Sequence, residues 1–192
     1  MHNLSCLGNG GYKRYINWER KAIMSKIKFE VITEKDVELV REIYLYYVRN
    51  STATFHIREI SLEEMKALVI FSEPKYEGYL IKMEDEVCGY VLLTQFKPRE
   101  AFSHSAEVTI YLKHGYEGRG IGRIAIEFIE TRAREPEKEI HTLLALICGE
   151  NIGSRMLFEK SGYSMCGVYR EVGYKFDRWL DLITYQKLIV KE

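Results

Sequence analysis

The sequence has few of the features that mark several common classes of protein. Only three prolines occur among its 192 residues, while 46% of the residues are hydrophobic. This composition excludes a collagen-like chain and a disordered, low-complexity chain. Lys plus Arg and Asp plus Glu each count 28, so the formal net charge is +0. No overall field attracts a polyanion, and we expect neither nucleic acid nor a membrane as a partner.

Long apolar runs and paired cysteine motifs are also missing. The longest apolar run, residues 143–148, is far shorter than the roughly 20 residues that cross a bilayer. The N-terminal part has no continuous apolar segment of signal-peptide length. The four cysteines form no C-x-x-C pair, which predicts reduced, buried thiols and neither a disulfide framework nor a bound metal. These features predict a cytoplasmic protein.

The composition changes about 24 residues into the chain. Residues 1–24 begin with a glycine-rich turn and continue with basic and aromatic side chains. We expect this segment to be a poorly ordered extension or an upstream start, and a basic binding arm is the alternative. Residues 25–192 have the length and composition of one domain.

Hydrophobic periodicity predicts alternating strands and helices from Ser25 onward. Strands are expected over residues 27–32, 79–83, 87–96, 106–112 and 140–147, with two aromatic-rich strands at the end. Helices are expected to begin near Thr33, Ser61, Gly120 and Asn151. The nearly continuous apolar run at 140–147 predicts a strand inside the sheet. The sum is an α+β domain around a mixed sheet.

One glycine-rich segment predicts a phosphate site. Gly118, Gly120 and Gly122 alternate with other residues between a predicted strand and an amphipathic helix. Glycines let the backbone approach a ligand closely, and amides at the start of a helix attract anions. The segment is not a Rossmann fingerprint, because Arg123 stands where the third glycine would be, and no Gly-Lys-Ser/Thr makes it a Walker A loop. A glycine-rich turn without a ligand is the alternative.

Five blocks occur in order within residues 27–188, namely residues 51–55 followed by 61–65, residues 106–112, residues 118–122, residues 151–154 with 159–163, and residues 173–182. They give this span a resemblance to the GNAT superfamily of acetyl-CoA-dependent N-acetyltransferases, and within it to the phosphinothricin acetyltransferase-like branch. It implies a GNAT-type fold, which is a mixed, mostly antiparallel sheet flanked by helices. It also implies acetyl-CoA as the co-substrate and no metal.

The resemblance assigns cofactor contacts to three segments. Ile110, Tyr111 and Leu112 are expected along the pantetheine arm, and Asn151 and Ser154 on its other side. The diphosphate is expected on the turn that comprises Gly118, Arg119, Gly120, Ile121, Gly122 and Arg123. Glu117 departs from the family, which usually has Arg or Gln there. An acidic side chain weakens diphosphate binding unless it points away.

The resemblance also implies a general base. An amine attacks a thioester only as the free base, and Glu107 matches the family's proton acceptor, often acting through a water. A solvated surface charge is the alternative for Glu107. Backbone N–H groups near Ile110 are expected to stabilise the oxyanion of the tetrahedral intermediate. Phe158 stands where relatives have Tyr or His and donates no proton, so the general acid stays unassigned.

Two cations precede the proposed base. Lys97 and Arg99 suit a carboxylate or phosphinate on the acceptor, and the resemblance adds Phe55 and Phe102 to the acceptor site. Phe102 stands where Tyr is common in the family, which removes one hydroxyl contact. A solvated basic loop is the alternative for the two cations.

These residues predict an enzyme that acetylates the amine of a small molecule. The expected acceptor is an amino acid or an analogue such as phosphinothricin or methionine sulfoximine. The alternatives are a protein N-terminus or polyamine acetyltransferase, and a non-catalytic acyl-CoA-binding sensor. The chain has fourteen tyrosines and the resembled family is commonly dimeric, so we expect a homodimer.

Overall fold

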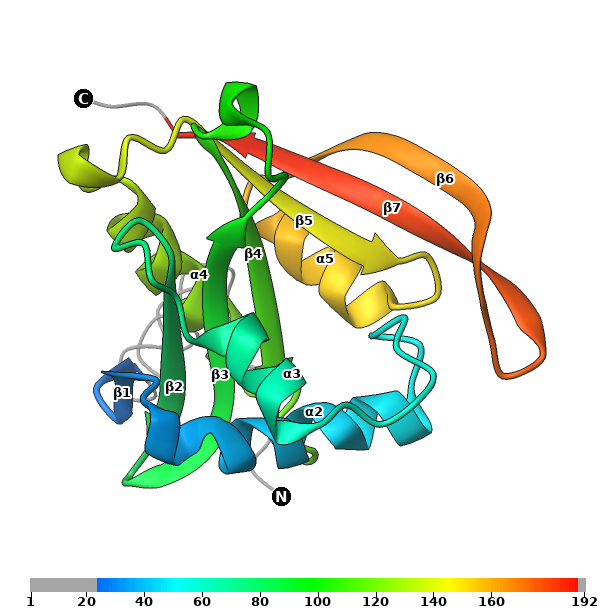
Figure 1. The fold of residues 1–192 in the computed structure, drawn as a ribbon, viewed down its shortest axis with the longest axis horizontal. Coiled ribbons are helices and arrows are strands. Elements are labelled where there is room, and N and C mark those ends of the chain that lie inside the picture. The colour runs from blue at the N-terminus through cyan, green and yellow to red at the C-terminus, as the bar shows by residue number, and fades with distance from the viewer. Residues whose placement is uncertain (1–23, 190–192) are drawn as a thin grey trace, which may run out of the picture.

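A computed structural model describes residues 24–189, which form one seven-stranded sheet with helices on both faces (Figure 1). The strand order is β1-β2-β3-β4-β5-β7-β6, and every pair is antiparallel except β4 with β5. The fold is therefore the α+β, mostly antiparallel arrangement that the sequence predicts. The strands are β1 (Ile27–Val31), β2 (Glu77–Met83), β3 (Glu86–Gln95), β4 (Ser105–Leu112), β5 (Thr142–Cys148), β6 (Ser164–Lys175) and β7 (Arg178–Leu188).

The helices follow their sequence signals. α2 (Val37–Asn50) and α3 (Leu62–Val69) cover one face of the sheet, and α4 (Ile121–Ala133) and α5 (Ile152–Lys160) the other (Figure 1). The Ser61 hydroxyl accepts a hydrogen bond from the Glu64 amide, and the Glu64 carboxylate accepts from the Ser61 amide. This capping box starts α3 as the sequence predicts. Short 3₁₀ helices are η1 (Glu34–Asp36), η2 (Glu100–Phe102) and η3 (Pro136–Lys138).

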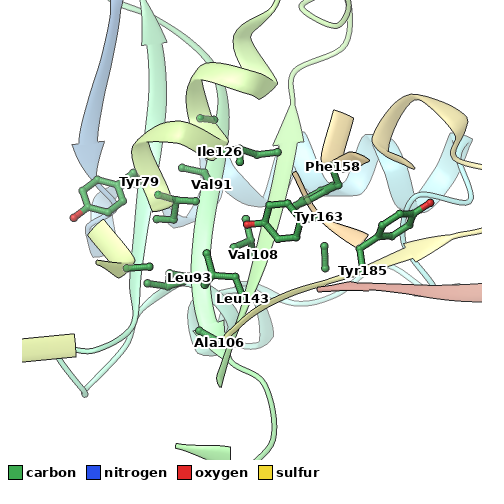
Figure 2. Close-up of a cluster of buried hydrophobic side chains, with 14 of the residues drawn as sticks. Tyr79, Val91, Leu93, Ala106, Val108, Ile126, Leu143, Phe158, Tyr163 and Tyr185 are labelled. Carbon is green, nitrogen blue, oxygen red and sulfur yellow. The ribbon is translucent and has the colours of Figure 1, made fainter. Parts of the chain in front are cut away.

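Alternation along the strands divides the core into two layers. Val91 and Leu93 of β3 pack with α4 and α5, whereas Tyr90 and Leu92 pack with α2 and α3. Figure 2 shows the first layer, in which Phe158 meets Tyr163 among strand residues. Side chains at successive strand positions point to opposite faces, so one strand serves both layers.

The pairing between β4 and β5 ends halfway along the two strands, and this separation positions the site. Their parallel register covers only the pairs from Ser105 with Thr142 to Glu107 with Leu144. β4 stays paired with β3 as far as Leu112, and β5 stays paired with β7 as far as Cys148. Beyond Glu107, the edge of β4 that faces β5 has no strand partner in the part of the chain described. Its amides and carbonyls on that side are open to a ligand.

The cysteines agree only in part with the prediction that they are buried thiols. Cys88 and Cys148 are free and buried as predicted, but Cys166 is exposed because it lies on the outermost strand, β6. Cys6 and the predicted N-terminal extension lie outside the described residues, apart from Met24. None of the helices within residues 24–189 is long and apolar enough to cross a membrane. The same residues contain no cluster of three or more metal-ligating side chains.

Candidate active site

A cavity of about 510 Å³ opens where β4 and β5 separate. We call it the cofactor cavity. Residues 108–112 of β4 and 145–147 of β5 form its sides, and the first turns of α4 and α5 close its ends. Nine predicted cofactor-binding residues line it, namely Ile110, Tyr111, Leu112, Gly118, Gly120, Gly122, Arg123, Asn151 and Ser154. Residues from four elements thus meet around one space.

The start of α4 suits a diphosphate. Gly118 and Gly120 have φ angles of 73° and 81°, which favour glycine, and a Cβ built on either one meets no atom within 4 Å. No side chain of the described residues caps the helix. The first amides of an α-helix lack partners inside the helix, and they carry the positive end of its dipole. The turn therefore presents uncapped donors to an open space, as an anion requires.

The charges around the cofactor cavity favour an anion on balance. Arg123 and Lys160 line it, together with one acidic side chain, Glu117. The Glu117 carboxylate accepts hydrogen bonds from the Gly115 amide, at 2.8 Å, and from the Tyr47 hydroxyl, at 3.1 Å. These bonds hold the carboxylate against its own turn. Sequence reasoning missed Lys160, although this cation sits inside one of the five family blocks.

Asn151 combines a local structural role with its place in the cofactor cavity. Its side-chain Oδ1 accepts a hydrogen bond of 3.0 Å from the Ser154 amide, and this bond caps α5 as the sequence predicts. The Nδ2 group makes no hydrogen bond within residues 24–189, so both of its N–H donors remain for a ligand. A single asparagine can therefore start the helix and contact the pantetheine arm.

Two other predicted cofactor residues have side chains outside the cofactor cavity. The Arg119 guanidinium stacks 4.9 Å from the centre of the Tyr116 ring, and Ile121 is completely buried in the core. Any contact of these two residues with a diphosphate is therefore left to their backbone amides. The expectation for these two residues is thus confined to the main chain.

A second cavity, of about 570 Å³, lies on the opposite face of the sheet beneath α2 and α3. We call it the acceptor cavity. Its walls are aromatic and apolar, with a few polar groups: Tyr44, His56, Met65, Ala67, Leu68, Ile70, Phe71, Ser72, Glu73, Tyr76, Tyr90, Leu92, Thr94, Gln95, Glu107, Thr109 and Tyr111. Thr109 and Tyr111 line both cavities. β4 is therefore the wall at which the two spaces meet.

Glu107 lies in the acceptor cavity at the position where β4 leaves β5. No hydrogen bond to its carboxylate occurs within the described chain. Burial raises the pKa of this carboxyl from 4.5 to about 7, and the Lys97 charge opposes the rise. A buried acid that titrates near neutral pH can accept a proton at pH 7 and lose it again. This is the behaviour expected of a general base.

The acceptor cavity that holds Glu107 also contains hydrogen-bonded groups that the sequence did not reveal. The Tyr44 hydroxyl lies 2.5 Å from Thr54 Oγ1 and 2.5 Å from His56 Nδ1. The Tyr111 hydroxyl donates to the Ala53 carbonyl at 3.2 Å. Burial raises the pKa values of both tyrosines, so both hydroxyls stay protonated. The only sequence signal for these groups was that Tyr44 follows the helical spacing of the buried residues of α2.

None of the four predicted acceptor residues lines the acceptor cavity. Lys97 and Arg99 are exposed in the loop between β3 and β4, and Lys97 lies close enough for its charge to act on Glu107. Phe102 follows in η2 and meets Phe96 edge-on at 5.9 Å between ring centres. Phe55 lies against Gly173. The structure therefore brings Lys97 near the proposed base and leaves the role of the other three as a prediction.

Phe158 lines the cofactor cavity and is 4% exposed. Its ring meets Tyr163 edge-on, with 4.9 Å between ring centres. The side chain supplies an apolar wall and no proton. The general acid therefore stays unassigned.

The comparisons with known proteins agree with this geometry. The pattern that defines the acetyltransferase (GNAT) domain matches residues 29–184. The chain belongs to the GNAT acetyltransferase family. It is therefore an acetyl-CoA-dependent N-acetyltransferase, and the cofactor cavity fits acetyl-CoA through its split strands, uncapped helix and cations.

Two relatives and one solved structure show the branch. The chain is 29% identical over 160 residues to a phosphinothricin N-acetyltransferase of Streptomyces coelicolor, which covers 80% of this chain and 91% of that protein. It is 30% identical to an L-methionine sulfoximine/L-methionine sulfone acetyltransferase of Pseudomonas paraeruginosa, over 79% of this chain and 88% of that protein. A phosphinothricin acetyltransferase of Sinorhizobium meliloti, solved with AcCoA, superposes with a TM-score of 0.78 at 25% identity, covering 85% and 88% of the two chains.

Proposed function

We propose that this enzyme acetylates the α-amino group of a free amino acid or amino acid analogue, with Glu107 as the general base. The observation that carries the proposal is the place of Glu107, which faces the acceptor cavity at the point where β4 opens toward the cofactor cavity. A base at this point reaches an amine that approaches from one face while the thioester lies on the other.

The chemical step is direct transfer. The amine nitrogen attacks the thioester carbonyl carbon, forming the C–N bond and moving the carbonyl electrons onto oxygen. The open amides of β4 near Ile110 stabilise that oxyanion. The amine proton passes to the Glu107 carboxylate, directly or through a water. The C–S bond then breaks, and the CoA thiolate leaves and takes a proton from solvent, because Phe158 has none to give.

The walls of the acceptor cavity narrow the acceptor class. Apart from His56, its charged residues are Glu73 and Glu107, and no Lys or Arg lines it within residues 24–189. An acceptor carboxylate is therefore disfavoured inside it, whereas an apolar group fits among its aromatic rings. Lys97 and Arg99 lie outside the cavity lining. We place the amine at Glu107, the side chain inside and the carboxylate toward these cations.

The names of the relatives support an amino acid analogue as acceptor, since phosphinothricin and methionine sulfoximine both carry an α-amino acid head group. A polyamine is the competing acceptor, which the two carboxylates of the acceptor cavity favour and the nearby Lys97 disfavours. A protein N-terminus is a further alternative. A non-catalytic acyl-CoA sensor is disfavoured by the buried carboxyl that titrates near neutral pH.

A thiol-release assay on matched amines tests the proposal. We expect CoA release with L-methionine sulfoximine, phosphinothricin and L-phenylalanine, weaker release with phenethylamine, which lacks only the carboxylate, and none with spermidine. The variant Arg99→Ala should raise the acceptor KM for the amino acids and leave it unchanged for phenethylamine. Acetyl-CoA binding without release on any amine would contradict the proposal. Preference for spermidine would favour the polyamine alternative.

We further propose that the enzyme is a homodimer. The β6–β7 hairpin projects beyond the body of the molecule (Figure 1) and exposes large apolar side chains at Met165, Val168, Tyr169, Val172, Tyr174, Phe176 and Trp179. Such a surface favours a protein partner. Light scattering should give twice the mass of the chain, and Trp179→Asp should give a monomer. A monomeric wild type would contradict this assembly.

The proposed location is the cytoplasm, where acetyl-CoA is available and thiols stay reduced. The free state of Cys88, Cys148 and Cys166 supports it. Fractionation of expressing cells tests the location, and recovery of the enzyme outside the cytoplasmic fraction would contradict it.

A further inference from the structure

Lys175 is buried without an acidic partner. The residue ends β6, just before the turn into β7, and is only 3% exposed. Its ammonium group donates to the main-chain carbonyls of Ser51 at 2.7 Å, Thr54 at 3.0 Å and Tyr47 at 3.4 Å. No carboxylate within residues 24–189 bonds to it. Burying a charge costs free energy, and an apolar side chain of similar length would fill the same space at a lower cost.

The acceptors of Lys175 explain why the charge is stable there. Tyr47 lies in the last turn of α2 and Ser51 is its C-cap, so their carbonyls belong to the negative end of the helix dipole. The Ser51 carbonyl has no partner inside the helix and receives one from the ammonium, whereas the Tyr47 carbonyl also accepts from the Ser51 amide. Lys175 thus ties the β6–β7 hairpin to the segment that follows α2, residues 51–55, which we call the junction loop.

The junction loop lines the cofactor cavity and is hydrogen-bonded to residues of the acceptor cavity. Ala53 lines the cofactor cavity, and its carbonyl accepts the hydrogen bond from Tyr111, a residue of both cavities. Thr54 contacts the Tyr44 hydroxyl, which in turn contacts His56, and the last two line the acceptor cavity. A displacement of this loop therefore moves hydroxyl and imidazole groups on the acceptor side of β4.

A second contact holds the same loop against the hairpin. A Cβ built on Gly173 would lie 2.5 Å from Phe55 Cε1, so the Phe55 ring fits only because position 173 has no side chain. Gly173 and Lys175 both belong to the block at 173–182 that defines the family resemblance. Neither has a part in the chemistry described above.

We propose that Lys175 is a positioning residue for acetyl transfer, which acts by holding the junction loop so that Tyr44, His56 and Tyr111 face the acceptor. The inference rests on the proposed function, because it needs turnover of an amine. It assigns to the end of the β6–β7 hairpin a role in acceptor binding, separate from the role of its outer face in assembly.

The test compares Lys175→Met with Lys35→Met, which removes an exposed lysine from η1. We expect Lys175→Met to lower kcat/KM for the acceptor by about tenfold or more, because small misplacements of reacting groups are costly in rate. Acetyl-CoA affinity should fall by about threefold at most, because Ala53 is the one junction-loop residue in the lining of the cofactor cavity and the amides of residues 118–123 make no contact with Lys175. Lys35→Met should match the wild type in both.

Coupling to the loop separates positioning from general stability. Thr54→Val removes the contact with Tyr44, and we expect the double variant Lys175→Met/Thr54→Val to lose no more activity than the worse single variant. Multiplied losses, or kinetics of Lys175→Met equal to those of Lys35→Met, would overturn the inference.

If Lys175→Met does not fold, Gly173→Ala decides, because its methyl group displaces Phe55 and hence the same loop. The same loss on the acceptor side supports the inference, and wild-type kinetics overturns it. An inactive wild type would remove the proposed function instead.

Discussion

Replacing Glu107 by Gln separates catalysis from stability, since the two should change in opposite directions. Glutamine keeps the shape of the side chain and removes both the proton acceptor and the buried charge. We expect kcat to fall by about 10²–10⁴-fold, the usual contribution of a positioned general base. Acetyl-CoA affinity should stay unchanged, because Glu107 does not line the cofactor cavity.

The stability effect follows from the raised pKa. Burial moves the pKa of Glu107 from 4.5 to about 7, and each tenfold change in an ionisation constant corresponds to about 1.4 kcal/mol. Between these two pH values the folded state binds more protons than the unfolded state, so the wild type loses stability as the pH rises through this window. The loss amounts to about 3 kcal/mol, and the Glu107→Gln variant avoids it because its side chain does not ionise.

Two assays measure the two effects. Urea unfolding at pH 4.5 and pH 8 should show that Glu107→Gln gains about 3 kcal/mol on the wild type as the pH rises. The pH profile of kcat/KM should show a rise with an inflection near pH 7 in the wild type, which the variant lacks, while any inflection from the acceptor amine remains in both. A stability difference that is independent of pH, or a variant that keeps its activity, would refute the reasoning.

Three further changes test the surroundings of the site. Gly120→Val should raise the acetyl-CoA Kd by about tenfold or more in calorimetry. Gly115 has a similar positive φ outside the cofactor cavity, so Gly115→Ala should lower only the melting temperature. Equal Kd values for the two variants would contradict diphosphate binding by the amides of residues 118–123. Glu117→Gln should tighten acetyl-CoA binding a few-fold at low salt, and weaker binding would show that its charge is not repulsive. Lys97→Ala should move the inflection of Glu107 to higher pH, and an unmoved profile would show that its charge does not reach the base.

Local patterns in the sequence predicted most of the elements. The amphipathic helix predicted after Gly120 is α4, with Ile121, Ile124 and Ala125 on its buried face, and Asn151 caps α5 as expected. The turn between β2 and β3 lies in the gap between the two predicted strands, with positive φ at Glu84 and Asp85. Such features depend on neighbours within a few residues, so a single sequence contains them.

The separation of β4 from β5 could not be predicted in this way. It depends on where a parallel pairing between distant segments ends, after Glu107 and Leu144, and no local pattern records that position. The buried Lys175 is a second example, since its sequence context is an exposed turn and its partners lie more than 120 residues earlier. Arg119 is a case in which a local motif was misleading for the side chain. The motif predicted a ligand contact, but the side chain stacks on Tyr116.

The central claim is that a thioester and an amine meet across β4, and a crystal structure with bound acetyl-CoA tests it most directly. We expect the diphosphate on the amides of residues 118–123, the pantetheine arm along residues 108–112, and the acetyl carbon facing Glu107 from the side opposite α3. A diphosphate bound elsewhere, or an acetyl carbon too far from Glu107 for one amine to reach both, would contradict the claim.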